Sequence, residues 1–223
     1  MTQSGLAVFD MDGTLLDSLP DIADCVREIL ASHGLPPVSD AVVRGMIGNG
    51  VQALVETLIR TVDPHGQIGI NPDETVQQFL RLYMPRATRL SCLFPGTEDA
   101  LETLRAQGWQ LAVCTNKPEA AARQILDHFG LTSLFASIGG GDSFPVRKPN
   151  PAHLLGTIEQ AGGHPASTVM IGDMMPDLLA AKGASARSLF AAWGYGNPAF
   201  AKEANGSASR MAEVPEKAAA LLG

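Results

Sequence analysis

One stretch near the start of this chain decides its fold: Leu6-Ala7-Val8-Phe9-Asp10-Met11-Asp12-Gly13-Thr14. Its first four residues are continuously apolar, which is typical of a strand covered on both faces of a parallel sheet. The run ends in two carboxylates, Asp10 and Asp12, whose like charges repel each other unless a cation or a shared proton relieves the repulsion. Mg²⁺ is a hard cation that carboxylates bind, so the stretch indicates a strand that leads into a metal site. One carboxylate would then be free to attack an electrophile and the other to move a proton.

Four more short apolar runs predict further strands of the same sheet. They are continuous rather than alternating and cover residues 110–114, 134–138, 168–171 and 188–192. Patterns between and before these runs predict helices at 97–107, 118–129, 151–162 and 176–184. Strands that alternate with helices are typical of an α/β fold, so we expect a Rossmann-like parallel sheet. The small, polar segment 204–212 is expected to be a loop.

The segment 19–92 interrupts this alternation. It offers amphipathic helical patterns around 20–33, 39–47, 50–62 and 73–87, separated by turns rich in glycine and proline, and no convincing strand. We therefore predict two domains. Residues 1–18 and 93–223 would form the α/β core, and residues 19–92 would form an α-helical domain inserted after the first strand.

The composition argues against several classes of protein. The formal net charge is -7 and no cluster of Lys and Arg occurs, which argues against nucleic acid as a partner. No apolar run approaches the roughly 20 residues of a membrane span. The cysteines, Cys25, Cys92 and Cys114, are odd in number and far apart, which indicates neither a disulfide framework nor a zinc site and fits a reducing compartment. We expect a cytoplasmic protein, free of the membrane, that is a monomer or a homodimer.

Polar residues follow the predicted strands at the edge where an open parallel sheet binds its ligands. Thr115 and Asn116 follow the second strand and begin a helix, whose exposed N–H groups and dipole make an anion site. Asp173 follows the strand 168–171, and Asp177 comes four residues later. Asp173 is the better candidate to complete an oxygen-only Mg²⁺ site with Asp10, whereas Asp177 is expected to position its neighbours. Simple helix capping is the alternative reading for Thr115 and Asp173.

Lys148 adds a positive charge to these groups. Pro149 follows it and favours an extended conformation, which presents a single ammonium group stiffly. A compact ammonium suits a transferring phosphoryl group, and a solvated loop lysine is the alternative.

Together the motifs resemble those of the haloacid dehalogenase-like hydrolase superfamily. The match covers essentially the whole chain through Asp10-Met11-Asp12-Gly13-Thr14, Thr115-Asn116, Lys148-Pro149 and Gly172-Asp173 to Asp177. The resemblance implies that Asp10 is the nucleophile that forms an aspartyl-phosphate, and that Asp12 protonates the leaving oxygen and then activates water.

The same resemblance implies the remaining contacts of the site. Mg²⁺ would be held by Asp10, the backbone carbonyl of Asp12 and Asp173. The phosphate oxygens would be held by Thr115, Asn116 and Lys148. Dehalogenases of this superfamily lack an acid in the place of Asp12, because a halide leaving group needs no proton. Asp12 therefore favours a phosphatase and makes a 2-haloacid dehalogenase a distant alternative.

The resemblance also implies that residues 19–92 form a cap that closes over the site and selects the substrate. Asp17 to Ile22, Val43 to Gly50 and Trp193-Gly194-Tyr195-Gly196 are similar to segments of phosphoglycolate phosphatases. In the cap, Arg44, Gly48 and Asn49 are candidate substrate contacts, with an ordinary turn as the alternative. The expected activity is hydrolysis of a small phosphorylated metabolite, first of all 2-phosphoglycolate. A phosphatase or mutase of a sugar phosphate, pyrophosphate or nucleoside monophosphate is the alternative.

Overall fold

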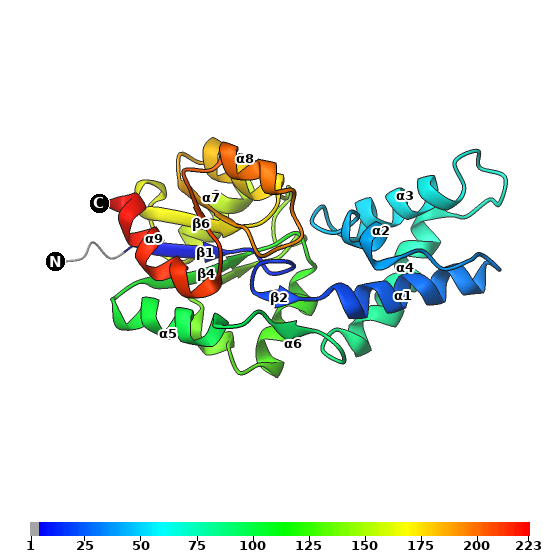
Figure 1. The fold of residues 1–223 in the computed structure, drawn as a ribbon, viewed down its shortest axis with the longest axis horizontal. Coiled ribbons are helices and arrows are strands. Elements are labelled where there is room, and N and C mark those ends of the chain that lie inside the picture. Colours follow the sequence, from blue (N-terminus) through cyan, green and yellow to red (C-terminus); the bar gives the residue numbers. More distant parts are fainter. Residues whose placement is uncertain (1–4) are drawn as a thin grey trace.

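Figure 1 shows a computed structural model of the protein, which describes residues 5–223. Within these residues, a six-stranded parallel sheet forms the centre of one lobe, with the strand order β5-β4-β1-β6-β7-β8. The α/β fold predicted from the sequence is therefore confirmed. The strands are β1 (Leu6–Phe9), β4 (Gln110–Cys114), β5 (Ser137–Gly139), β6 (Thr168–Gly172), β7 (Arg187–Ala191) and β8 (Gly206–Ala208).

Helices cover both faces of the sheet (Figure 1). Leu6 and Val8 of β1 pack with α7 and α8, whereas Ala7 and Phe9 belong to the larger core formed with the helices of the other face. This burial on two faces is why the strands are continuously apolar in the sequence. The covering helices are α5 (Thr97–Ala106), α6 (Glu119–His128), α7 (Pro151–Gln160), α8 (Met175–Gly183) and α9 (Val214–Leu222).

Two parts of the sheet differ from the sequence prediction. The strand predicted at 134–138 begins too early, because Thr132–Leu134 forms a 3-10 turn and β5 begins only at Ser137. The loop predicted at 204–212 is also wrong, since Gly206–Ala208 is β8 and pairs with β7. β8 lies at the edge of the sheet and consists of small residues, so no apolar run marks it in the sequence.

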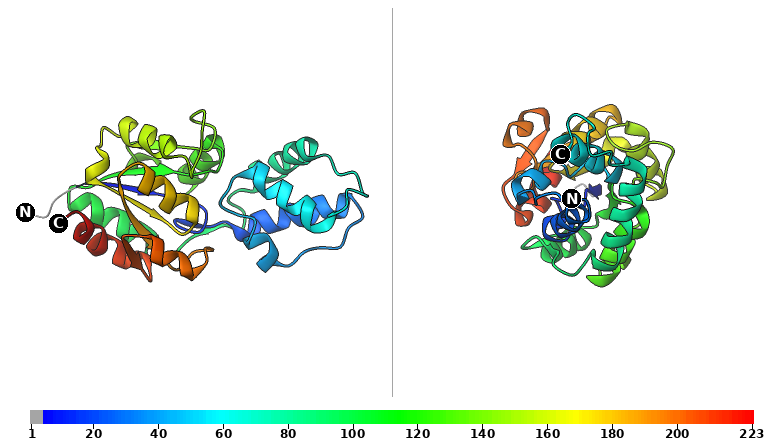
Figure 2. Two further views of the ribbon diagram at one scale, coloured as in Figure 1. Left: turned by 90° about the horizontal axis from the view of Figure 1, so that it is seen from above. Right: turned by 90° about the vertical axis from the view of Figure 1, so that its right-hand side faces the viewer.

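The remaining helices form a second lobe beyond the carboxyl end of β1 (Figures 1 and 2). The chain enters this lobe after β2 (Leu16–Asp17) and returns through β3 (Cys92–Leu93), and these two short strands pair antiparallel. The division of the chain into a core and an inserted domain of residues 19–92 stays a prediction. None of the helices in residues 5–223 is long and apolar enough to cross a membrane. The helices of this lobe are α1 (Leu19–Ser32), α2 (Asp40–Arg44), α3 (Val51–Val62) and α4 (Pro72–Tyr83).

A buried carboxylate ties the two connections between the lobes together. Asp21, in the first turn of α1, is 0% exposed. It accepts hydrogen bonds from the backbone N–H groups of Leu90 (2.9 Å) and Ser91 (2.8 Å), and from the Ser91 hydroxyl (2.7 Å). A buried charge is tolerated when several donors surround it. Asp21 therefore fixes the start of the helical lobe against the segment that leaves it.

We expect Asp21→Ala to lower the free energy of unfolding by about 2–4 kcal/mol, because the substitution leaves buried N–H and hydroxyl groups without an acceptor. Urea denaturation followed by circular dichroism measures this loss. Asp24→Ala is the matched control, since Asp24 lies on the same helix and pairs with Arg89 near the surface. Such a pair contributes about 0–1 kcal/mol. Equal losses in the two variants would contradict the role of Asp21.

Candidate active site

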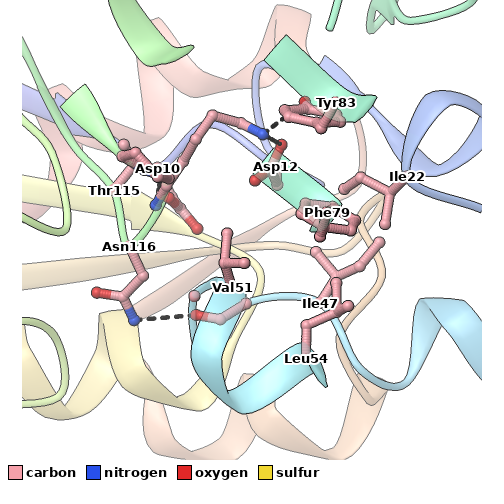
Figure 3. A pocket seen from close by; sticks show the side chains of 14 residues that line it. Asp10, Asp12, Ile22, Ile47, Val51, Leu54, Phe79, Tyr83, Thr115 and Asn116 are labelled. Atoms are coloured by element: carbon pink, nitrogen blue, oxygen red, sulfur yellow. Dashed lines mark hydrogen bonds and ion pairs between the residues drawn. The ribbon is translucent and has the colours of Figure 1, made fainter. Parts of the chain in front are cut away.

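A small cavity of about 40 Å³ lies between the sheet and the helical lobe. The core side of the cavity comes from the ends of β1 and β4 and carries the polar residues Asp10, Asp12, Thr115, Asn116 and Lys117. Figure 3 shows the opposite wall, to which the helical lobe contributes mainly apolar side chains. These are Ile22, Ile47, Val51, Leu54, Phe79 and Tyr83.

The end of β1 fixes the position of Asp10. The backbone N–H of Asp10 donates to Ile171 of β6 at 2.9 Å, and its side chain is buried at the carboxyl edge of the sheet. The chain then turns back sharply, since the carbonyl of Met11 accepts hydrogen bonds from three backbone N–H groups, those of residues 14, 15 and 16. Gly13 has a φ of +85°, and a Cβ at this position would collide with the carboxylate of Asp173. Only glycine allows the loop after β1 to pass so close to Asp173.

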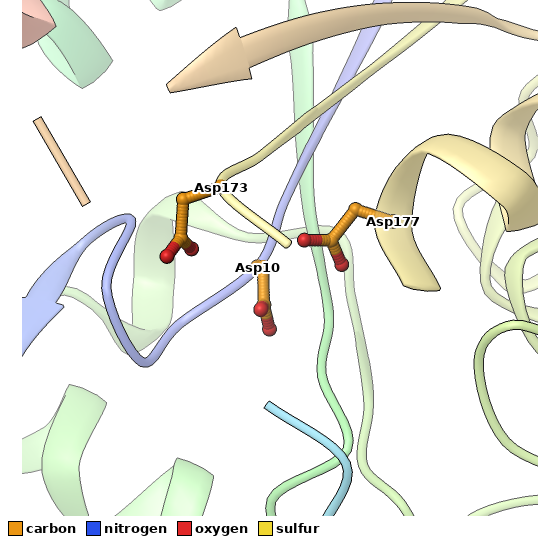
Figure 4. Close-up of side chains that lie close together, drawn as sticks. All are labelled: Asp10, Asp173 and Asp177. Atoms are coloured by element: carbon orange, nitrogen blue, oxygen red, sulfur yellow. The ribbon is translucent and has the colours of Figure 1, made fainter. Parts of the chain in front are cut away.

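Three buried carboxylates meet at this edge: Asp10, Asp173 and Asp177 (Figure 4). One oxygen from each of them lies within 4.8 Å of the others. Burial, together with the charges of Asp177 and Asp10, raises the pKa of Asp173 to about 8. Burial also raises the pKa of Asp177 to about 6. A divalent cation would relieve this repulsion, and an all-oxygen donor set suits Mg²⁺.

The three carboxylates have different neighbours. Asp177 accepts hydrogen bonds from the Lys148 ammonium at 2.7 Å and from the backbone N–H of Met174 at 2.9 Å, so each of its oxygens has a partner. Asp173 accepts from neutral donors, the Thr14 hydroxyl and the backbone N–H of Tyr195, both at 2.8 Å. Both oxygens of Asp177 thus already have partners, one of them the Lys148 ammonium, whereas the donors to Asp173 carry no charge. Asp173 is therefore a better candidate than Asp177 to hold a metal together with Asp10.

Lys148, the candidate phosphate-binding lysine, lies beside Asp10. Its Nζ donates to the Cys114 carbonyl (2.5 Å) and to Asp177 (2.7 Å), and lies 3.0 Å from Asp10 Oδ1. Burial opposes the charge on this buried side chain, but the carboxylates of Asp10 and Asp177 outweigh it and raise the pKa of Lys148. Lys148 is therefore held as a cation by two hydrogen bonds and by an ion pair with Asp10.

Thr115 and Asn116 lie at the end of β4, where the Asn116 amide binds backbone carbonyls. Its Nδ2 donates to the carbonyls of Gly48 and Lys148, both at 3.0 Å, so both amide protons are used. Figure 3 shows one of these two hydrogen bonds as a dashed line from Asn116. The expected contact between Asn116 and a phosphate oxygen stays a prediction. The amide holds the turn at Gly48 against the core. The Thr115 hydroxyl lines the cavity and accepts from the Lys117 backbone N–H at 3.3 Å.

The structure brings only part of the candidate cap turn to the cavity. Gly48 lines it with a φ of +108°, and a Cβ there would lie 3.0 Å from the Met174 side chain. Arg44 and Asn49 are exposed and do not line the cavity. The Arg44 guanidinium lies 5.7 Å from the centre of the Tyr195 ring. The substrate contacts expected of Arg44 and Asn49 stay predictions.

Lys117 is a cavity residue that the sequence analysis did not identify. Its Nζ donates to the Tyr83 hydroxyl at 2.7 Å and lies 3.0 Å from Asp12 Oδ1. In Figure 3, dashed lines at the labelled Asp12 and Tyr83 side chains mark these two contacts. Burial opposes the charge, but Asp12 and Tyr83 raise the pKa of Lys117. The Asp12 carboxylate thus faces an ammonium group rather than the acidic cluster. The feature of the sequence that could have identified Lys117 as a site residue is its position directly after Thr115-Asn116.

Comparison with known proteins agrees with this arrangement. A family model described as haloacid dehalogenase-like hydrolase matches residues 7–191. The phosphoglycolate phosphatase of Cereibacter sphaeroides (strain ATCC 17025 / ATH 2.4.3) is 38% identical over 96% of this chain and 98% of its own length. That of Agrobacterium fabrum is 37% identical over 86% of this chain and 82% of its own length.

A solved structure shares the whole architecture. The crystal structure of a predicted phosphoglycolate phosphatase from Haemophilus somnus 129PT superposes with a TM-score of 0.90 at 32% identity, over 97% of this chain and 99% of that one. With the acidic cluster, the buried lysine and the inserted helices in the same fold, the chain belongs to the haloacid dehalogenase-like hydrolase family.

Proposed function

We propose that this protein is a Mg²⁺-dependent phosphomonoester hydrolase that acts on 2-phosphoglycolate through an aspartyl-phosphate on Asp10. The observation that carries the proposal is the position of Asp10, at the floor of the cavity, between the Lys148 ammonium and the Asp173 carboxylate. The two relatives that share 37% and 38% identity with this chain over most of its length are named phosphoglycolate phosphatases, which supports the substrate.

An anionic carboxylate attacks an anionic phosphate only where positive charge surrounds both. Lys148 supplies one such charge, 3.0 Å from Asp10, and Asp177 and the Cys114 carbonyl hold it in place. Asp10, Asp173 and the backbone carbonyl of Asp12 would hold Mg²⁺, which when bound neutralises charge on the nucleophile and on the phosphate oxygens.

Asp12 is suited to move the proton. In the first step an Asp10 oxygen bonds to phosphorus while the ester P–O bond breaks, and the leaving oxygen takes a proton from Asp12. In the second step Asp12 takes a proton from water, whose oxygen attacks phosphorus. Phosphate then leaves and the Asp10 carboxylate is restored. The apolar wall of the helical lobe limits the access of bulk water to the intermediate.

The size of the cavity favours a small leaving group. About 40 Å³ lies between core and lobe, and apolar side chains close the far wall. Pockets that enclose drug-sized ligands are roughly 300–1,000 Å³. A leaving group of a few atoms, such as glycolate, therefore needs less displacement of the lobe than a sugar or a nucleoside does.

We expect Asp10→Asn to lower kcat for 2-phosphoglycolate by at least about 1,000-fold, because a neutral amide is a poor nucleophile. Release of inorganic phosphate measures the rate, and circular dichroism checks the fold. Asp99→Asn is the control, since Asp99 is an exposed residue of α5 and should keep the wild-type rate. Near-normal turnover by Asp10→Asn would contradict the assignment of the nucleophile.

Removal of divalent metal with EDTA should abolish phosphate release, and added Mg²⁺ should restore it. If the wild-type enzyme keeps its rate in EDTA, the proposed metal dependence is wrong.

Two substitutions that each replace a carboxylate by an amide distinguish the roles of Asp173 and Asp177. Asp173→Asn should raise the Mg²⁺ concentration needed for half-maximal activity by at least about tenfold, since a metal ligand loses its charge. Asp177→Asn should lower kcat with a smaller effect on the Mg²⁺ requirement, because Asp177 acts by holding Lys148. Titration of activity with Mg²⁺ measures both effects. The reverse pattern would mean that Asp177 is the ligand.

A further inference from the structure

The cavity poses an electrostatic problem for a substrate with two acid groups. In a molecule such as 2-phosphoglycolate, the phosphate can lie against Asp10 and Lys148, but the carboxylate must then enter the part closed by apolar side chains of the helical lobe. Burial of a carboxylate in apolar surroundings is unfavourable unless a cation pairs with it. Arg44 does not meet this need in the structure, because it is exposed and lies over Tyr195.

Of the two buried ammonium groups near the cavity, Lys117 has a proton to spare. Lys148 donates hydrogen bonds to Asp177 and to the Cys114 carbonyl and forms an ion pair with Asp10 at 3.0 Å, so three oxygens of the core surround it. Lys117 has two partners among the described residues, the Tyr83 hydroxyl and Asp12. Because an ammonium group carries three donors, one N–H of Lys117 remains available to a ligand.

Tyr83 provides a second donor at the same place. Its oxygen accepts the Lys117 N–H, and among residues 5–223 its own O–H donates to no neighbour. Burial raises the pKa of Tyr83 to about 12, so the hydroxyl keeps its proton at neutral pH. The Lys117 ammonium also lies 4.5 Å from the centre of the Tyr83 ring, which adds a cation–π contact and holds the pair together. Lys117 and Tyr83 together thus offer an N–H and an O–H to the two oxygens of a carboxylate.

Lys117 and Tyr83 also lie beside Asp12, the residue that acts on the leaving group in the proposed mechanism. Lys117 contacts Asp12, which donates its proton to the leaving oxygen, whereas Lys148 contacts the nucleophile Asp10. An acid group one carbon from the leaving oxygen would therefore be directed toward Lys117. Tyr83 belongs to α4 of the helical lobe, so this pair forms only while the lobe lies against the core.

From this geometry we infer that Lys117 and Tyr83 form the subsite that binds the carboxylate of the leaving group, and that Lys117 selects phosphate esters that carry an acid group. The inference rests on the proposed phosphatase activity and names the residues that determine its substrate class. Lys117 is a specificity residue here, and Tyr83 completes its site from the helical lobe.

Binding of unreactive analogues tests the inference independently of turnover. 3-Phosphonopropionate carries a carboxylate and propylphosphonate lacks it, and isothermal titration calorimetry with Mg²⁺ present measures both dissociation constants. We expect the wild-type protein to prefer 3-phosphonopropionate by at least about 30-fold, since the carboxylate meets a buried charge. Lys117→Met should bind the two analogues within about threefold of each other, and Lys117→Arg should recover part of the preference.

Tyr83→Phe is the second variant, which keeps the ring and the ammonium group and removes one donor. It should lower the preference by about five- to tenfold. An unchanged preference in both Lys117→Met and Tyr83→Phe, or no preference in the wild-type protein, would overturn the subsite. If Lys117→Met does not fold, as judged by thermal unfolding, Tyr83→Phe alone decides the question.

Turnover measurements test the subsite and the proposed function separately. Phosphate release from 2-phosphoglycolate and from 2-hydroxyethyl phosphate should show the same preference in kcat/KM, and Lys117→Met should lose it mainly through KM. Hydrolysis of both esters without preference would overturn the subsite and leave the phosphatase standing. A binding preference without any phosphate release would support the subsite and refute the proposed function.

Discussion

Repulsion among carboxylates buried at one edge of the sheet is the constraint on which this structure depends. Asp10 and Asp173 come from adjacent parallel strands, and Asp177 joins them from the first turn of α8. The surroundings compensate these charges with the Lys148 ammonium and with N–H and hydroxyl donors to Asp173. Close approach of the donors requires glycine. A Cβ at Gly13, Gly194 or Gly196 would collide with Asp173. The edge is thus built to hold negative charge together, which is what a divalent cation and a phosphoryl group require.

The two buried lysines contact different carboxylates of the site, Lys148 with Asp10 and Lys117 with Asp12. Lys148 is held by oxygens of the core and lies beside Asp10, whereas Lys117 binds Tyr83 of the helical lobe. The amide of Asn116 makes a second connection by binding the Gly48 carbonyl. The site is therefore complete only while the lobe lies against the core, and the polar groups that join the two parts are also those that line the cavity. This arrangement agrees with a cap that encloses the substrate during reaction.

The sequence predicted the parts of this structure that depend on burial and strand order. β1, β4, β6 and β7 are covered on both faces, so their apolar runs are visible, and their ends bring Asp10 and Asp173 together. β8 was missed because a small edge strand has no such run. The sequence also could not predict which neighbours the side chains after β4 would contact. The side chain of Lys117 contacts Asp12 and Tyr83, and that of Asn116 contacts the carbonyls of Gly48 and Lys148. These contacts join segments far apart in the chain, as does the position of Arg44 over Tyr195.

In the proposed mechanism, the carboxylate at the end of β1 carries the phosphoryl group during turnover. Rapid acid quench of the enzyme during hydrolysis of 2-phosphoglycolate, followed by proteolysis and mass spectrometry, tests it most directly. We expect the peptide containing Asp10 to gain the mass of one phosphoryl group, and fragmentation to place the group on Asp10 rather than on Asp12. Turnover with no phosphorylated peptide at any quench time, or with the group on another residue, would contradict it.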